Sequence, residues 1–267
     1  MVQINILNQT SSKFMALPVV VSVSLIVQAL ASMSAILPSA IAPELALALG
    51  VPGSLIGFQV SCIYVGAMAT SLVGGVLVRR FGALRCFQMA LFLVAFGGAM
   101  SAIPLLLAVG VGGAIVGLGY GLTNPPSSHL LMKVTTSKNR NLVFSIKQTG
   151  VPLGGVAAGL IGPWVALQFG WQMVLISVAL VSLLLMLFIS IFRPYWDTDR
   201  DAKAALWTNP WKDVGIVWKY KGLRWVSLSA FSFAAIQVGL STFTVTMLVG
   251  DLNFNLIEAG VILAVMQ

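Results

Sequence analysis

Ionisable residues are scarce in this sequence. Charged residues make up only 8% of the 267 residues, with 7 acidic residues and 1 histidine, whereas hydrophobic residues make up 58%. Because soluble globular domains carry about 25% charged residues, this composition excludes an ordinary soluble protein. A mean hydropathy of +0.98 indicates an integral, all-α membrane protein instead.

Cysteine and histidine are also too few to suggest a reactive centre. Cys62 and Cys86 lack any CxxC or histidine spacing, so we expect them to be small buried apolar residues rather than a disulfide or a metal site. No paired carboxylates and no nucleophile–base set stand out. The sequence therefore predicts no metal, no cofactor and no enzyme activity.

The net charge of +8 does not indicate a nucleic-acid partner. A phosphate-binding surface gathers its cations on one folded face. Here the cations form short clusters between long apolar runs, which is the distribution expected of a protein whose partner is the lipid bilayer.

Long uncharged intervals define the predicted spans. About 20 helical residues cross a bilayer core of about 30 Å. The interval 86–132 is long enough for two crossings and divides at Ile103-Pro104, because proline disfavours helix in the residue before it. The predicted spans are roughly 16–37, 55–78, 86–103, 105–131, 142–166, 172–192 and 225–248.

An eighth span is predicted to begin near Asn255. Only about 13 residues remain from there to Gln267, which is too short a helix to cross the bilayer. We therefore expect the chain to be truncated within its eighth transmembrane helix.

The cations predict the orientation of the spans. All 15 Lys and Arg residues precede the first span or lie in or at the border of the even-numbered connections. Because cytoplasmic loops carry the excess of Lys and Arg, we expect a multi-pass protein of the cytoplasmic (inner) membrane with a cytoplasmic N-terminus.

The sixth connection, residues 193–224, is long and rich in tryptophan. Asn209-Pro210 predicts the start of a helix, with asparagine as the N-cap and proline at the first helical position. Trp211, Val214 and Trp218 then share one face, which predicts a helix lying in the lipid headgroup region.

Three segments carry a family resemblance. GLGYGLTNPPSSHLL and FSIKQTGVPLGGVAAGLIGP resemble the fourth and fifth spans of the major facilitator superfamily (MFS) of secondary transporters. GGVLVRRFGALR resembles its Gly-x-Leu-Ala-Asp-Arg-x-Gly-Arg-Lys loop motif, which Gly75, Arg80 and Gly82 match, with Arg85 one place beyond the basic pair. Arg79 replaces the acidic residue, so any latch made through that carboxylate must form otherwise.

The resemblance implies an MFS-type helix bundle and its domain organisation. Residues 1–192 would form the N-terminal six-helix bundle, 193–224 a cytoplasmic linker, and 225–267 the start of the C-terminal bundle, whose missing helices would be a partner. The implied function is secondary transport of a small organic solute by alternating access. A membrane sensor or scaffold without a transport cycle is the alternative.

Small residues at four-residue spacing predict close helix packing. Gly113, Gly117 and Gly121 repeat along the fourth span, and Gly150 and Gly154 along the fifth. In a membrane such stripes let helix backbones approach each other.

Polar residues inside the spans are the candidate substrate-binding residues. Gln28 and Ser32 in the first span have the same spacing as Gln237 and Ser241 in the seventh. The resemblance places these spans and the fourth around a central cavity, so we expect both glutamines to meet there. Asn124 joins them where Pro125-Pro126 loosens the fourth span. The alternative is an interhelical hydrogen bond without a ligand.

Lys147 and Gln148 complete the predicted site. No Asp or Glu lies within spans one to seven, which disfavours a cationic substrate and favours a neutral or anionic one. Lys147 would bind a substrate carboxylate, or else extend its amine to the headgroups. His129 and Glu258 remain as proton-relay candidates, although a lone histidine near a membrane face is commonly interfacial.

Overall fold

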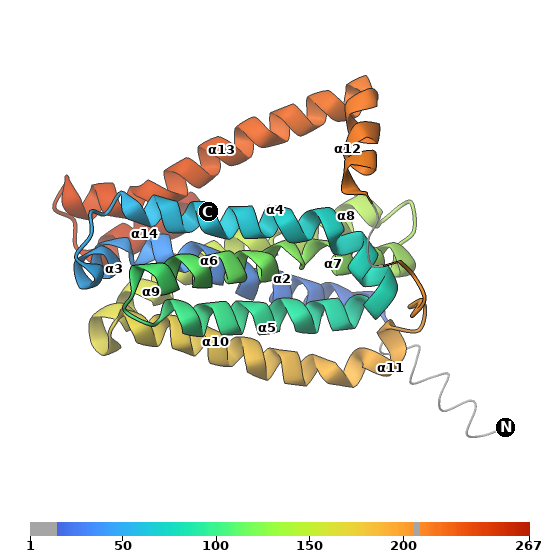
Figure 1. The fold of residues 1–267 in the computed structure, drawn as a ribbon, viewed down its shortest axis with the longest axis horizontal. Helices are drawn as coiled ribbons and strands as arrows, with labels where there is room; N and C mark the ends of the chain where they lie inside the picture. The colour runs from blue at the N-terminus through green and yellow to red at the C-terminus, as the bar shows by residue number, and fades with distance from the viewer. Residues whose placement is uncertain (1–14, 206–208) are drawn as a thin grey trace.

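The chain folds into a bundle of long, roughly parallel helices (Figure 1). The structure is a computed structural model that describes residues 15–205 and 209–267. Within these residues, 7 helical segments are long and apolar enough to cross a membrane: Leu17–Ala40, Leu55–Phe81, Ala83–Ser101, Leu106–Val134, Arg140–Phe169, Trp171–Trp196 and Lys221–Gly250. Each overlaps one predicted span, so the predicted all-α polytopic fold is confirmed.

The helices run in this order: α2 (Leu17–Ala40), α3 (Ala42–Leu49), α4 (Leu55–Phe81), α5 (Ala83–Ser101), α6 (Leu106–Gly121), α7 (Asn124–Val134), α8 (Arg140–Gln148), α9 (Gly150–Phe169), α10 (Trp171–Phe188), η1 (Ile189–Phe192), α11 (Arg193–Trp196), α12 (Pro210–Lys219), α13 (Lys221–Gly250) and α14 (Leu256–Met266).

The fourth and fifth spans are each interrupted. In the fourth, α6 ends at Gly121 and α7 begins at Asn124, directly before the Pro125-Pro126 pair that was predicted to loosen the helix. The carbonyl oxygen of Gly121 accepts a hydrogen bond from the Ser71 hydroxyl at 3.3 Å, which satisfies part of the broken backbone. In the fifth, Thr149 separates α8 from α9.

Helix α3 was not predicted. It lies in the first connection, with Pro43 in its first turn and Glu44 near its N-terminus, and it ends at Gly50 in the left-handed conformation with φ of 64°. These are ordinary start and stop signals. An 8-residue helix is too short to register as a span, so counting uncharged intervals passed over it.

The buried apolar residues form two clusters. One contains Leu37, Ile41 and Trp171 and joins α2, α3, α4, α9, α10, α13 and α14. The other contains Phe87 and Trp196 and joins α2, α4, α5, α7 and the end of the sixth span. Helices α2 and α4 have buried residues in both clusters and so connect the two ends of the bundle.

Glycines bring α6 against α4 and α9 against α2. A Cβ atom at Gly117 would overlap the carbonyl oxygen of Ile63, and one at Gly121 would overlap that of Ala67. Gly113 faces the side chain of Gln59 in the same contact.

The α2–α9 contact has the same character. A Cβ at Gly150 would lie 2.8 Å from the Leu25 carbonyl oxygen, and one at Gly154 would overlap that of Ala29. Backbone therefore meets backbone along both contacts, which is the geometry that small residues allow in a membrane.

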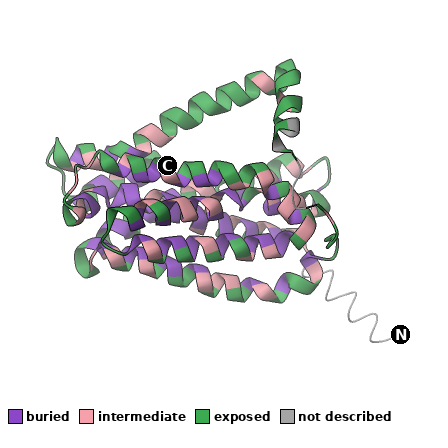
Figure 2. Ribbon diagram, in the orientation of Figure 1, coloured by how far each residue is buried: buried purple, intermediate pink, exposed green. Residues whose placement is uncertain are grey.

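Helix α13 stands apart from the bundle over much of its length. Figure 2 shows it exposed along most of the ribbon, and its buried residues are confined to Thr242–Leu248. Helix α12 precedes it and lies across the direction of the spans (Figure 1). The Asn209 side chain accepts from the Trp211 N–H at 3.0 Å, which confirms the predicted N-cap. The side chains of Trp211 and Trp218 are both exposed.

Both cysteines are free thiols. Cys86 is buried in the second apolar cluster, as predicted, and Cys62 is half-buried on α4.

Candidate functional site

A cavity of about 200 Å³ lies among α2, α4, α6, α9 and α13. Four of the predicted substrate-binding residues line it: Ser32, Gln148, Gln237 and Ser241. The Ser32 hydroxyl donates to the carbonyl oxygen of Val151 at 2.9 Å. Ser241 accepts from the Gln267 amide at 3.1 Å. We call this space the central cavity.

Two tyrosines also line the central cavity. Tyr64 on α4 and Tyr120 on α6 pack edge to face, with ring centroids 6.4 Å apart and an interplanar angle of 87°. Neither tyrosine was predicted as a site residue. Their signal in the sequence is a phenol within an otherwise apolar span, which is weaker than that of an amide or a charge.

The other predicted substrate-binding residues form a polar cluster beside the central cavity. The Lys147 ammonium donates to the side-chain oxygen of Asn124, and the lysine is only 3% exposed. The Gln28 side-chain oxygen accepts from the Thr123 hydroxyl at 3.0 Å, while its amide nitrogen is buried without a partner. We call Gln28, Thr123, Asn124 and Lys147 the polar cluster.

Each main member of the polar cluster lies four residues from a lining residue of the central cavity. On α2 the pair is Gln28 and Ser32. Between α6 and α7 it is Asn124 and Tyr120, and between α8 and α9 it is Lys147 and Val151. Four helical residues rise about 6 Å, so the polar cluster forms the next layer beyond the cavity. The two glutamines that were expected to meet therefore lie in adjacent layers, Gln28 in the cluster and Gln237 at the cavity.

The buried ammonium of Lys147 has no protein counter-ion. Among the described residues, ion pairs occur only at Asp199, which binds His129 at 2.8 Å and Lys133 at 2.6 Å. The amine does not extend to the bundle surface, because it is turned inward onto Asn124. An unpaired cation is costly to bury.

The two proton-relay candidates do not lie together. His129 on α7 pairs with Asp199 at the surface, where its side chain is 37% exposed. Glu258 belongs to a capping box at the start of α14, in which it exchanges hydrogen bonds with Asn255 at 2.8 and 3.1 Å. Helix α7 and the start of α14 lie toward opposite ends of the bundle (Figure 1). The geometry thus gives each a local structural role.

Partial burial opposes ionisation of Asp199, but its hydrogen bonds from Lys133 and His129 outweigh that effect and lower its pKa. The carboxylate is therefore ionised at neutral pH. It fastens the segment after the sixth span to α7.

A carboxylate from a distant part of the chain contacts the loop motif. Asp197, just after α11, accepts from the Leu84 N–H at 2.7 Å at the start of α5. Gly82 there has φ of 97°, and a Cβ on it would overlap the Asp197 side chain. Burial raises the pKa of Asp197, whereas the Leu84 N–H favours its ionised form. Asp197 thus contacts the loop motif at Gly82 and Leu84.

Further contacts join the same two segments. The Asp201 N–H donates to the Arg79 carbonyl oxygen at 2.9 Å, and the Arg80 guanidinium donates to the Ala204 carbonyl oxygen at 2.6 Å. The Arg85 guanidinium donates instead to the side-chain oxygen of Gln88 on its own helix, at 3.0 Å. Gly75 faces open space, so the motif's first glycine makes no close contact.

Replacing Asp197 with leucine is expected to destabilise the bundle. The change removes the acceptor for Leu84 N–H, and loss of a helix N-cap costs about 0.5–2 kcal/mol. Asp197→Asn keeps an acceptor oxygen and should destabilise the bundle less. Thermal unfolding in detergent measures both, with Asp201→Leu as the control because its exposed carboxylate bonds only within its own turn. Equal stability of Asp197→Leu and the unaltered protein would contradict this role.

The spans and the cavity together define a class: a multi-pass membrane protein with a small polar cavity inside its helix bundle. The chain belongs to the Major Facilitator Superfamily, whose family model matches residues 24–267. The family resemblance read from the sequence is confirmed.

Two curated relatives show the range of the similarity. The chain is 29% identical over 157 residues to the 4-hydroxybenzoate transporter PcaK of Acinetobacter baylyi, covering 58% of this chain and 34% of that protein. It is 30% identical over 128 residues to the multidrug resistance protein MdtH of Salmonella typhimurium, covering 47% of this chain and 31% of that protein. The chain thus spans about a third of the length of these relatives.

Among solved structures, the crystal structure of a D-xylose-proton symporter matches with a TM-score of 0.65 and 15% sequence identity. The match covers 92% of this chain and 64% of that one. At this identity the match shows a shared fold alone.

Proposed function

We propose that this chain is part of a secondary transporter that moves a small organic anion across the cytoplasmic membrane by alternating access. The observation that carries the proposal is Lys147, whose ammonium is buried against Asn124 with no carboxylate partner among residues 15–205 and 209–267. A substrate carboxylate would provide the missing counter-charge. Charge-assisted hydrogen bonds of this kind are among the stronger ones in proteins.

The central cavity supports a small solute. Its volume of about 200 Å³ lies below the roughly 300–1,000 Å³ of pockets for drug-sized ligands. The edge-to-face pair of Tyr64 and Tyr120 offers aromatic surface to a ring. The name of one relative, 4-hydroxybenzoate transporter, describes such a molecule, although another relative is named for multidrug resistance. An aromatic monocarboxylate is therefore the first solute to test.

Alternating access requires two helix bundles that move against each other. The chain covers 34% of PcaK and 31% of MdtH. We propose that residues 1–192 act as one bundle, that 193–224 link it to the next, and that C-terminal helices of the same transporter, beginning with 225–267, close the other side of the central cavity.

Counterflow tests the proposed function. Proteoliposomes of the transporter with both halves are loaded with unlabelled 4-hydroxybenzoate and diluted into a trace of labelled solute. A carrier transiently accumulates the label, because it exchanges inner for outer solute. The neutral amide of the same acid is the control and should exchange poorly. No exchange of any small acid would favour a sensor or scaffold instead.

The orientation of the spans gives a separate prediction. Because every cation lies on one side, reporters fused at Arg85, Lys138 and Lys203 should all be cytoplasmic. Fusions near Val51 and Phe169 should be external. Alkaline phosphatase and green fluorescent protein fusions measure the two sides. Phosphatase activity at Lys138 would overturn both the orientation and the cytoplasmic N-terminus.

A further inference from the structure

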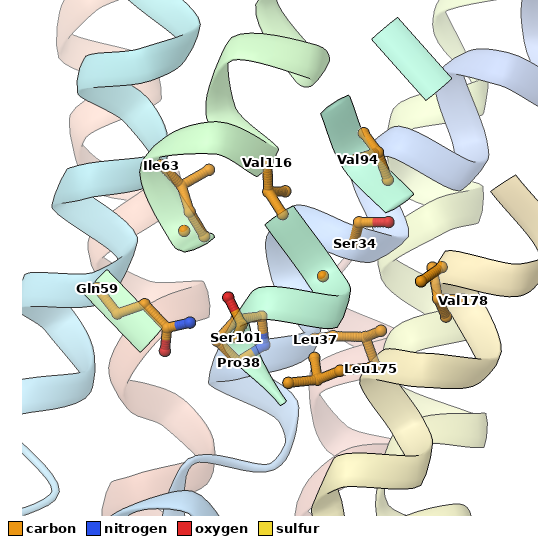
Figure 3. A pocket seen from close by; sticks show the side chains of 13 residues that line it. Ser34, Leu37, Pro38, Gln59, Ile63, Val94, Ser101, Val116, Leu175 and Val178 are labelled. Atoms are coloured by element: carbon orange, nitrogen blue, oxygen red, sulfur yellow. The ribbon is translucent and has the colours of Figure 1, made fainter. Parts of the chain in front are cut away.

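A second, much smaller cavity lies within the bundle, between α2, α4, α5, α6 and α10. Its lining is largely apolar, from residues such as Leu37, Ile63 and Leu175, but three polar side chains reach it: Ser34, Gln59 and Ser101. Figure 3 shows Gln59 of α4, Ser101 of α5 and Ser34 of α2 among the side chains that line this cavity.

Two of these polar groups are buried and have no hydrogen-bond partner in the part of the chain that the structure describes. The side-chain oxygen of Gln59, on a residue only 4% exposed, has none, and neither has the hydroxyl of Ser101, on a residue 2% exposed. An unsatisfied polar group at membrane depth costs several kcal/mol. The adjacent glycines of α6 lie against them, Gly112 against the Ser101 hydroxyl and Gly113 against the Gln59 side chain. Both groups therefore lie at the same small cavity.

The size and chemistry of the cavity select its ligand. The space open to the centre of a water molecule is about 10 Å³, close to the roughly 10–15 Å³ that one water requires. Buried waters typically make about three hydrogen bonds. Ser101 can donate one, while Gln59 and Ser34 can accept the others, since the Ser34 hydroxyl already donates to the Leu30 carbonyl oxygen at 2.8 Å.

We propose that this cavity binds a single water molecule that joins α2, α4 and α5. The water accepts from the Ser101 hydroxyl and donates to the Gln59 and Ser34 oxygens. It satisfies both orphaned groups and links three spans across positions where no direct side-chain bond connects them. The helices of the N-terminal bundle are then linked by a water-mediated hydrogen-bond network that is separate from the central cavity.

Hydroxyl-radical labelling by X-ray pulses tests this water, because radicals formed on a bound water modify the buried side chains that touch it. The intact protein in lipid nanodiscs is irradiated in water enriched in ¹⁸O. Leu37, Ile63 and Leu175 should be modified several-fold more than Leu84 and Leu91, which are equally buried away from the cavity. Equal labelling of the two groups in the unaltered protein would overturn the proposal, whatever the variants do.

Two variants sharpen the result. Gln59→Leu combined with Ser101→Ala removes the polar partners, and labelling should fall to the level of Leu91. Ser182→Ala is the matched control, because this buried hydroxyl already donates to the Val178 carbonyl oxygen at 2.8 Å; its labelling should match the unaltered protein. Replacing potassium with sodium in the buffer should change nothing. Loss of labelling in sodium would show that the site binds a cation and would overturn the proposal of a bound water.

Discussion

Replacing Lys147 with methionine is expected to abolish transport of the anionic solute while the protein remains folded in the membrane. Losing one partner of a buried charge pair costs about 2–5 kcal/mol, or about 30-fold to several thousand-fold in affinity. Stability should hold, because the substitution also removes an ammonium that is buried without a counter-ion. Lys147→Arg keeps the charge in a bulkier group and should retain part of the activity.

The measurement is initial-rate uptake in proteoliposomes of the transporter with both halves, normalised to protein inserted. Lys133→Met is the matched control, since Lys133 pairs with Asp199 near the surface and should be dispensable for uptake. Uptake by Lys147→Met at the unaltered rate would remove the main support for an anionic substrate. A loss of stability with no change in solute preference would assign Lys147 to structure alone.

Replacing Gly117 with alanine should destabilise the bundle by about 3 kcal/mol, at the upper end for overpacking. The new Cβ would overlap the carbonyl oxygen of Ile63, and backbone cannot move aside as a flexible side chain does. Gly110→Ala on the same helix is the control, because among the described residues no atom beyond its own stretch of helix lies within 4 Å of an added Cβ. Alanine favours helix over glycine by about 1 kcal/mol, so the control should be neutral or stabilising.

Thermal unfolding in detergent and yield of inserted protein measure both variants. The two variants carry the same substitution on the same helix, so the difference between their stabilities isolates the α4–α6 contact. Similar behaviour of Gly117→Ala and Gly110→Ala would mean that this contact does not limit stability.

The spans were predictable because their signal is local. Uncharged length, the Pro125-Pro126 pair and the Asn209 cap act on the residues beside them, and each was confirmed. Helix α3 carried local signals too, but it was too short to stand out among the apolar intervals.

The site was less predictable because its contacts join residues far apart in sequence. The hydrogen bond between Asp197 and Leu84 joins residues 113 positions apart in the sequence, and that between Lys147 and Asn124 joins residues 23 positions apart. Nothing in the local pattern of either residue names its partner. The family resemblance pointed to the first, fourth and seventh spans, but it did not separate the layer of Ser32 from the layer of Gln28.

The interruptions of the fourth and fifth spans lie where the central cavity meets the polar cluster. On α2, Gln28 and Ser32 share one unbroken helix and keep a constant spacing. Tyr120 and Asn124 stand on either side of the α6–α7 break, and Lys147 and Val151 on either side of Thr149. The glycine contacts of α6 and α9 lie on the cavity side of these breaks or at them. Bending at either break would therefore displace Asn124 and Lys147 of the polar cluster relative to the cavity lining, while the glycine contacts hold α6 against α4 and α9 against α2.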